Sequence, residues 1–333
     1  MNHPIILRAL NWRPAVDPSP RALLADLKHR CGGRVDAKGL STVANDSDDS
    51  APIAAIVLPA HFFGCAVAEV LGLQPLDHAA LRAVAAAPRF AWEEALDLCA
   101  QAARRTRSVL VPGTHVRAFG NSTRHGAFVV GPDGSVMAQV WQTHRSRSEE
   151  WLFDERGDEL PIFETPVGNI GVIVGRDAYY PETARMLALR GADVILSPQA
   201  TAAPLNPWRQ LSGVWKDAQQ NQVFAVEAHM QGTMWGRSFE GRSAILGPCE
   251  ITPDGSGFLS EPGDAFFESA SSESGNLESE PLKEEPLIRE TQVGLRERSQ
   301  AQAVFSIFPH LNPALYRNQP WWQTPEGPGG NRP

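Results

Sequence analysis

The sequence lacks the clustered basic charge and the long apolar runs that nucleic-acid and membrane proteins need. Its 333 residues carry 30 Lys and Arg against 38 Asp and Glu, a formal net charge of −8. No segment supplies the grouped Lys and Arg that phosphate contacts require, so we expect no nucleic-acid partner. No apolar run approaches the ~20 residues that span a bilayer. The first apolar run is interrupted by Arg8, so we expect neither a membrane segment nor a signal peptide.

Cysteine is also scarce, and its positions form no pattern. The four cysteines stand at 31, 65, 99 and 249, with no CxxC pair and no spacing typical of metal ligands. This favours a reduced, cytoplasmic protein without a metal or another cofactor. Cys31 and Cys99 follow apolar residues at helical spacing and are expected to be core thiols.

Strand and helix patterns alternate along the rest of the chain, which predicts an α/β fold. Each expected hairpin has a turn signal, Pro-Asp-Gly in the first and Asp-Gly in the second. We expect strands at 4–12, 53–59, 108–116, 172–175, 194–198 and 301–308, helices at 18–33, 92–106 and 181–190, a helix and strand within 214–233, and hairpins at 125–141 and 240–263.

Two stretches are too polar to form part of a core. Residues near 33–52 are mostly small or polar, and residues 268–290 hold seven glutamates against two basic residues. Both are expected to be flexible loops. The alternative for the second is an acidic segment that binds a protein partner. We therefore expect a single domain over 1–317, followed by a Pro- and Gly-rich tail over 318–333.

Six local patterns, in a fixed order, resemble the nitrilase or carbon–nitrogen hydrolase superfamily over roughly Ile5 to Arg317. They are IVLPAHFFG, the GPDG hairpin, RGDELPIFETPVGNIGVIVGRD, YYPETARMLALRGADVILSP, QNQ leading to VFAVEAH, and FEGRSAILGP. The resemblance implies a four-layer αββα sandwich that pairs into an αββααββα homodimer. It also implies an active site with a Glu, a Lys and a Cys. The thiolate attacks a carbonyl or nitrile carbon, the carboxylate moves protons, and the ammonium stabilises the developing negative charge.

At the three positions that match those catalytic residues, this sequence has other side chains. Ala60 follows the strand-ending proline, Gln142 stands in the lysine's segment, and Gly175 ends the strand that would present the cysteine. None of the three can form an acyl intermediate or move a proton, so no catalytic residue is expected at these positions. Asp177 and Pro181, by contrast, suit the anchoring of the turn and the start of a helix.

This combination predicts a catalytically degenerate member of the superfamily, a pseudoenzyme. We expect it to bind a small ligand in a relict pocket that includes His61, His144, Arg176 and Asp177, or to act as a scaffold or regulator of a protein partner. Arg176 would either pair with an anionic ligand or pair internally with Glu227 or Asp177.

Two enzymatic alternatives remain open from the sequence. A divergent hydrolase of carbon–nitrogen bonds other than peptide bonds would need a relocated nucleophile. Cys65 is the best candidate and Cys249 the next, and such a thiol should be accessible with a lowered pKa. A metal-dependent hydrolase would place zinc between two or three of the histidines and a carboxylate, and the candidates are His61, His144, His229 and Asp177.

Overall fold

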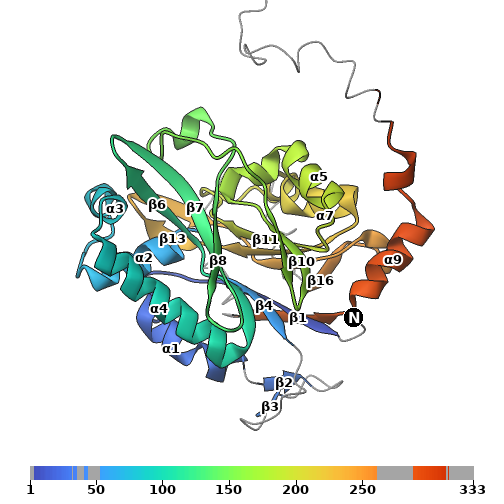
Figure 1. Ribbon diagram of the computed structural model, residues 1–333, viewed down its shortest axis with the longest axis horizontal. Helices are drawn as coiled ribbons and strands as arrows, with labels where there is room; N and C mark the ends of the chain where they lie inside the picture. The colour runs from blue at the N-terminus through green and yellow to red at the C-terminus, as the bar shows by residue number, and fades with distance from the viewer. Residues whose placement is uncertain are drawn as a thin grey trace, which may run out of the picture.

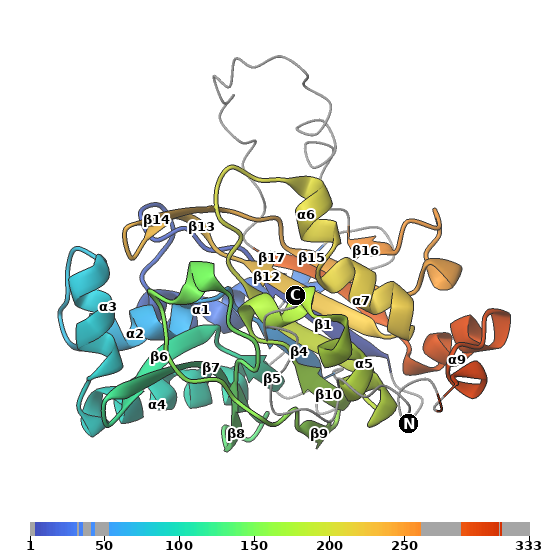
Figure 2. The same cartoon turned by 90° about the horizontal axis from the view of Figure 1, so that it is seen from above.

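Three apolar clusters divide the protein into four layers: helices, a sheet, a second sheet and further helices. The computed structural model describes residues 4–31, 33–35, 41–43, 53–260, 288–312 and 314. One cluster lies between the first helices and the first sheet, one between the two sheets, and one between the second sheet and its own helices. Figures 1 and 2 show these layers from two directions. The αββα sandwich implied by the resemblance is confirmed.

The first sheet is built around three parallel strands, β1, β4 and β5. In spatial order it contains β17 (Ile288–Val293), β1 (Ile5–Leu10), β4 (Ala54–Val57), β5 (Ser108–Val111), β7 (Ser122–Val130) and β6 (Thr114–Phe119), with β8 (Val136–Trp141) also paired to β7. Four helices belong to this half of the molecule: α1 (Pro20–Cys31), α2 (Phe62–Val70), α3 (His78–Ala85) and α4 (Arg89–Thr106).

The second sheet also has a parallel centre, formed by β10, β11 and β12. In spatial order it contains β16 (Phe258–Ser260), β15 (Ala244–Leu246), β12 (Phe224–His229), β11 (Val194–Gln199), β10 (Gly168–Val172) and β9 (Ile162–Thr165). The remaining elements are the helices α5 (Pro181–Leu189), α6 (Pro207–Leu211), α7 (Val214–Asn221) and α9 (Leu295–Val304), the hairpins β2 (Gly33–Val35) with β3 (Ser41–Val43) and β13 (Gln231–Met234) with β14 (Arg237–Glu240), and the 3-10 turns η1 (Arg147–Glu149), η2 (Gly175–Tyr179), η3 (Cys249–Ile251) and η4 (Phe308–His310).

The central strands are apolar on both faces because each lies between two other layers. Along β4, Ala54 and Ile56 join the cluster under the first helices, while Ala55 and Val57 join the cluster between the sheets. Side chains of a strand alternate between its two faces, so a continuous apolar run serves both clusters. Burying each larger side chain contributes about 1.5–3 kcal/mol relative to leaving it exposed.

Three expected strands differ from the structure. The strand expected at 172–175 lies earlier, as β10 at Gly168–Val172, and η2 already begins at Gly175. Residues 108–116 form two strands rather than one, because the chain turns at Pro112 and Gly113 between β5 and β6. Residues 301–308, expected as a strand, form the end of α9 and the start of η4. An apolar run of this length does not distinguish a strand from a helix by its period. The edge of the first sheet is formed by β17, which pairs with β1.

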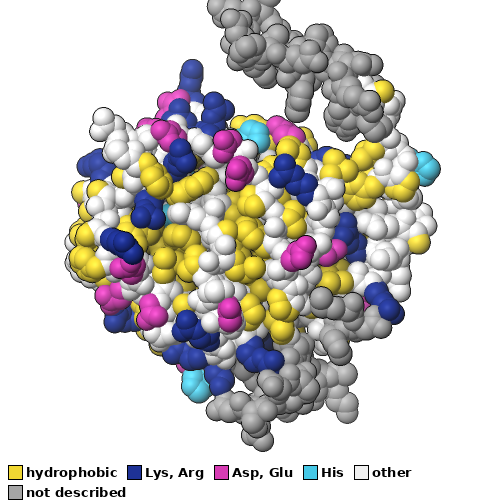
Figure 3. Space-filling model, viewed as in Figure 1, with side chains coloured by type: hydrophobic (Ala, Val, Ile, Leu, Met, Phe, Trp, Pro, Cys, Tyr) yellow, Lys and Arg dark blue, Asp and Glu magenta, His cyan; other side chains and the backbone are white. Residues whose placement is uncertain are grey.

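The ranges expected to be flexible lie largely outside the described residues. Within them the structure places the short hairpin β2–β3, and residues 288–290 belong to β17. The tail at 318–333 lies outside the described residues. In the part of the chain that the structure describes, no helix is both long enough and apolar enough to cross a membrane. Basic and acidic side chains are interspersed on the face seen in Figure 3.

Candidate functional site

The carboxyl ends of the parallel strands of both sheets meet at one edge of the sandwich. Gln199, the last residue of β11, links two of these ends. Its backbone carbonyl accepts a hydrogen bond from the Ala60 N–H at 3.3 Å, and its Nε2 donates to the Gly175 carbonyl at 2.9 Å. Ligands of α/β proteins generally bind outside the carboxyl ends of parallel strands. This edge is therefore the candidate site.

Gly175 begins η2 in a left-handed backbone conformation, with φ of +52°. A Cβ added there would lie 3.2 Å from Oε1 of Gln142 and 3.4 Å from Cε1 of His125. Gln142 and His125 thus occupy the space into which a side chain at 175 would project. Gln142 therefore lies beside Gly175, and Gln199 links Gly175 to Ala60.

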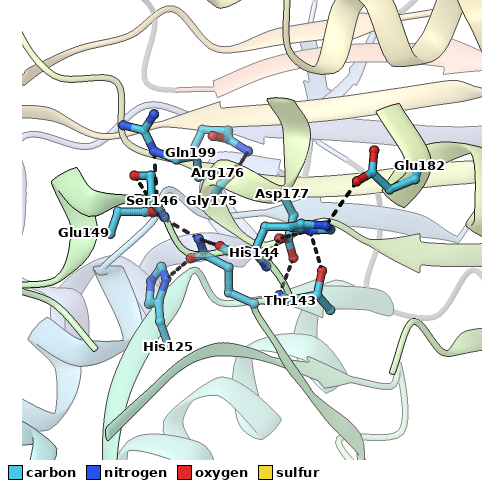
Figure 4. A network of polar contacts seen from close by, with 11 residues as sticks. His125, Thr143, His144, Ser146, Glu149, Gly175, Arg176, Asp177, Glu182 and Gln199 are labelled. Carbon is cyan, nitrogen blue, oxygen red and sulfur yellow. Dashed lines mark hydrogen bonds and ion pairs between the residues drawn. The ribbon is translucent and has the colours of Figure 1, made fainter. Parts of the chain in front are cut away.

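Gln142 is fully buried and its amide orientation is set by its partners. Nε2 donates to the His144 carbonyl at 2.6 Å and to Oε1 of Glu149 at 3.0 Å. Oε1 lies 2.6 Å from Nδ1 of His125 and must accept from it, because an amide oxygen has no proton to donate. Figure 4 shows this chain of contacts.

His125 is consequently a neutral imidazole with its proton on Nδ1. Its Nε2 lies 2.7 Å from Oγ1 of Thr114 and accepts the hydroxyl proton, while Thr114 Oγ1 accepts from the His61 N–H at 2.8 Å. Burial lowers the pKa of His125, and its hydrogen bond to Gln142 opposes this shift, as do the charges of Glu149 and Asp177. Hydrogen bonds thus link Gln142, His125, Thr114 and the backbone of His61 in one chain.

Asp177, in η2, joins its turn to the loop that follows Gln142. Its carboxylate accepts from the backbone N–H of Thr143 at 2.8 Å and of His144 at 2.7 Å. The His144 ring stacks on Tyr180 with centroids 4.0 Å apart, and its Nε2 lies 3.3 Å from Glu182. Figure 4 shows His144 turned towards these carboxylates. The His144 ring is therefore held by Tyr180, Asp177 and Glu182.

Arg176 pairs with a residue that the sequence reasoning missed. Its Nε lies 3.4 Å from Oε2 of Glu149, and its guanidinium is 6.0 Å from the centre of the Tyr179 ring. Glu149 therefore contacts both Gln142 and Arg176. No sequence signal marked Thr114, His125 or Glu149, because each is a single polar residue on a separate segment.

Glu227 and His229 form a second buried polar group, on β12. His229 Nε2 lies 3.3 Å from Oε2 of Glu227, whose Oε1 accepts from Gln210 at 3.0 Å. His229 Nδ1 lies 3.4 Å from Oγ1 of Thr201. Glu227 is thus held by Gln210 and His229, and Arg176 forms its ion pair with Glu149. In the described part of the chain, no group of three or more His, Cys, Asp or Glu residues is arranged to hold a metal ion.

The cysteine thiols lack the positive, accessible surroundings that would lower their pKa and make them nucleophiles. Cys65 is 2% exposed, and its Sγ lies 3.1 Å from the sulfur of Met234. Burial and the nearby charge of Glu69 raise the pKa of Cys65 well above its ordinary value, which disfavours the thiolate. Burial also raises the pKa of the partly exposed Cys249. Cys31 and Cys99 are buried, as expected for core thiols.

The contacts at Gly175 predict a stability cost for any side chain there. We expect Gly175→Ala to lower the free energy of unfolding by about 1–2 kcal/mol, because of the left-handed backbone and the hydrogen-bonded neighbours that cannot yield freely. Urea unfolding would measure the change, with Gly255→Ala as the matched control. Gly255 has φ of +71° and nothing within 4 Å of an added Cβ. Equal losses in the two variants would show that the space at Gly175 is open.

Comparison with known proteins assigns the family. The carbon-nitrogen hydrolase family model matches residues 56–252. A nitrilase of Pyrococcus abyssi is 32% identical over 146 residues, which cover 44% of this chain and 53% of that protein. The chain thus matches about half the length of this curated relative.

Solved structures share the fold over nearly the whole chain. A carbon-nitrogen hydrolase of Helicobacter pylori G27 gives a TM-score of 0.63 at 16% identity, covering 95% of this chain and 97% of that one. An amidase of Nesterenkonia sp. AN1, with an acetamide moiety on its active-site cysteine, gives 0.58 at 17% identity and 95% of each chain. On the extent of the family match, this chain belongs to the carbon-nitrogen hydrolase family.

Proposed function

We propose that this protein is a non-catalytic member of its family that binds a small ligand at the site around Ala60, Gln142 and Gly175. The observation that carries the proposal is the occupied space beside Gly175, where Gln142 and His125 stand within 3.4 Å of any added Cβ. A thiol is absent from position 175, a carboxylate from position 60 and an ammonium from position 142. In a mutant of the Nesterenkonia amidase, by contrast, the active-site cysteine carries the acetamide moiety of fluoroacetamide.

Hydrogen bonds hold the polar groups around this site: Asp177 fixes the loop of Gln142, and Gln199 ties the ends of the two sheets together. These contacts support ligand binding over a purely structural role. Such a frame also suits a scaffold or regulator of a protein partner. We further propose a cytoplasmic homodimer, and α5 presents Met186 and Leu189, 40% and 56% exposed, as apolar contact residues.

The second candidate is a divergent carbon–nitrogen hydrolase with a relocated nucleophile. The family membership favours it, since the relatives named above include a nitrilase and an amidase. The buried setting of Cys65 and its raised pKa count against that residue as the nucleophile.

The test is ammonia release from acetamide, butyramide, benzonitrile, an N-carbamoyl amino acid and a ureide. We expect the wild-type protein and its Cys65→Ala variant to release no ammonia above the buffer rate, because no activated thiolate is present. Release by the wild-type protein that Cys65→Ala abolishes would overturn the proposal and identify Cys65 as the nucleophile. Release that survives this substitution would overturn it in favour of another group.

A further inference from the structure

The side chains around Gly175 are almost completely shielded from solvent. Ala60 is 1% exposed, Gln142 is 0% exposed and His125 is 3% exposed. A ligand that reaches these side chains needs a path, so a segment that covers them has to move.

Residues 145–153, here called the gate segment, cover this part of the site. Oε1 of Glu149 accepts a hydrogen bond from Nε2 of Gln142 at 3.0 Å, and the Phe153 ring lies 5.7 Å from the His125 ring, between centroids. Figure 4 shows Glu149 among the polar side chains of the site. Movement of the gate segment would therefore uncover both Gln142 and His125.

The gate segment is held to the rest of the protein by its side chains rather than by its backbone. The backbone N–H groups of residues 149, 150, 152 and 153 donate to carbonyls of residues 146, 147 and 149, within the segment itself. The chain is fixed just beyond each end, since the His144 N–H donates to Asp177 and the Asp154 N–H donates to the Thr123 carbonyl. Segments with few outward backbone hydrogen bonds open locally while the rest of a protein stays folded.

One contact at the outside joins the gate segment to the hairpin of β13 and β14. The Arg237 guanidinium lies 4.3 Å from the centre of the Trp151 ring, and the His78 ring meets the same indole edge-on at 5.5 Å. The hairpin itself is fixed, because the Trp235 N–H donates to the Leu76 carbonyl at 2.8 Å. Arg237 is exposed and forms no ion pair among the described residues, so its charge is directed to the ring.

We propose that the gate segment opens to admit a ligand to the site and that the Arg237–Trp151 contact controls how often it opens. A cation–π contact at an exposed position changes such an equilibrium by about two- to fivefold, enough to tune access without locking the site. This inference rests on the proposed function, since it describes access to the same site.

The test follows a thiol placed on the buried side of the gate segment in the full chain. Leu152 is 7% exposed, so iodoacetamide should modify Leu152→Cys mainly when the segment opens, and mass spectrometry locates the modified thiol. We expect position 152 to react at least about tenfold faster than Cys99, which is fully buried on α4 and reports unfolding of the whole protein. Arg237→Gln removes the charge and should raise the rate at 152 by about two- to fivefold. Arg237→Lys keeps the charge and should stay closer to the parent rate.

The matched control is Arg117→Gln, the same substitution at another guanidinium above an indole. Arg117 lies 5.2 Å from the centre of the Trp92 ring, and neither residue belongs to the gate segment or its hairpin, so the rate at 152 should not change. Reaction at 152 no faster than at Cys99 would overturn the gate. Equal rates with and without Arg237→Gln, or an equal rise in Arg117→Gln, would overturn the role of Arg237.

Hydrogen exchange gives a second readout that needs no new cysteine, in case Leu152→Cys does not fold. The amides of Leu152 and Phe153, which donate to the Glu149 carbonyl, should exchange about two- to fivefold faster in Arg237→Gln than in the wild-type protein. Unchanged exchange would contradict the role of Arg237. Neither readout uses a ligand, so ammonia release in the assay above would overturn the proposed function and leave the gate standing.

Discussion

Replacing Gly113 by alanine is expected to destabilise the protein by more than about 3 kcal/mol, or to prevent folding altogether. Gly113 lies in the turn between β5 and β6 and has φ of +80°. An added Cβ would stand 2.1 Å from the Pro59 carbonyl oxygen and 2.9 Å from Cβ of Phe62. The first contact is with backbone that forms the end of the β4 segment, so relief requires moving the strand end that carries Ala60.

The matched control for this prediction is Gly120→Ala. Gly120 has φ of +61°, but nothing lies within 4 Å of an added Cβ, so its substitution should cost only the conformational penalty of about 1 kcal/mol. Urea unfolding of both variants would separate the two effects. Midpoints that correspond to losses within about 1 kcal/mol of each other would contradict the close approach of Pro59 to Gly113.

The second large effect concerns the buried carboxyl of Asp217 on α7. The residue is fully buried, and neither carboxyl oxygen has a hydrogen bond within the described part of the chain. Lys216 Nζ lies 3.1 Å from Oδ1, close enough for an ion pair but outside hydrogen-bond geometry. Burial raises the pKa of Asp217 from 3.8 to about 7, and the charges of Lys216 and Arg185 oppose the shift.

The raised pKa makes stability depend on pH in a defined direction. Between pH 4 and pH 7 the folded protein holds the Asp217 proton more tightly than the unfolded chain, so the free energy of unfolding falls as the pH rises through this window. The full effect is at most about 4 kcal/mol, since each pKa unit corresponds to about 1.4 kcal/mol. By about one pH unit above 7 the loss is complete and the contribution becomes constant.

Asp217→Asn should remove this dependence while keeping the shape of the side chain. We expect the variant to be about 2 kcal/mol more stable than the wild-type protein at pH 8 and no more stable at pH 4. The buried histidines, such as His61, change stability in the opposite direction as the pH rises. The difference between variant and wild type cancels their contribution.

Denaturant unfolding at a series of pH values measures this difference. Asp97→Asn, on the exposed side of α4, serves as the control and should follow the wild-type profile. Parallel profiles for the wild-type protein and Asp217→Asn from pH 4 to pH 8 would contradict the assigned proton uptake.

Much of the fold was predictable because the central strands and helices have strong patterns. The hairpin of β7 and β8 followed from two apolar runs around a Pro-Asp-Gly turn, and α5 followed from Pro181 at its start and Gly191 after its end. The helix α9 was missed because its residues have neither a strong apolar stripe nor a clear start signal. Its place in the fold depends on contacts such as that of Arg298 with Asp193 at 2.6 Å.

The site was predictable only in part. The residues at 60, 142 and 175 could be named from the order of the sequence patterns, and Asp177 could be given an anchoring role. The partner of Arg176 was not among the residues expected, because Glu149 comes from a loop whose path the sequence does not define. Cys65 showed no sequence feature that separates a buried thiol from an accessible one.

The sequence by itself determined the order and type of most elements and which side chains stand at the ends of the parallel strands. Local propensity, apolar period and turn chemistry act between near neighbours, so these features are readable along the chain. Only the tertiary structure decided that His125 and Gln142 fill the space beside Gly175 and that the His61 ring stacks on His125. Those contacts join segments from both sheets, and their distances depend on how the two sheets pack against each other.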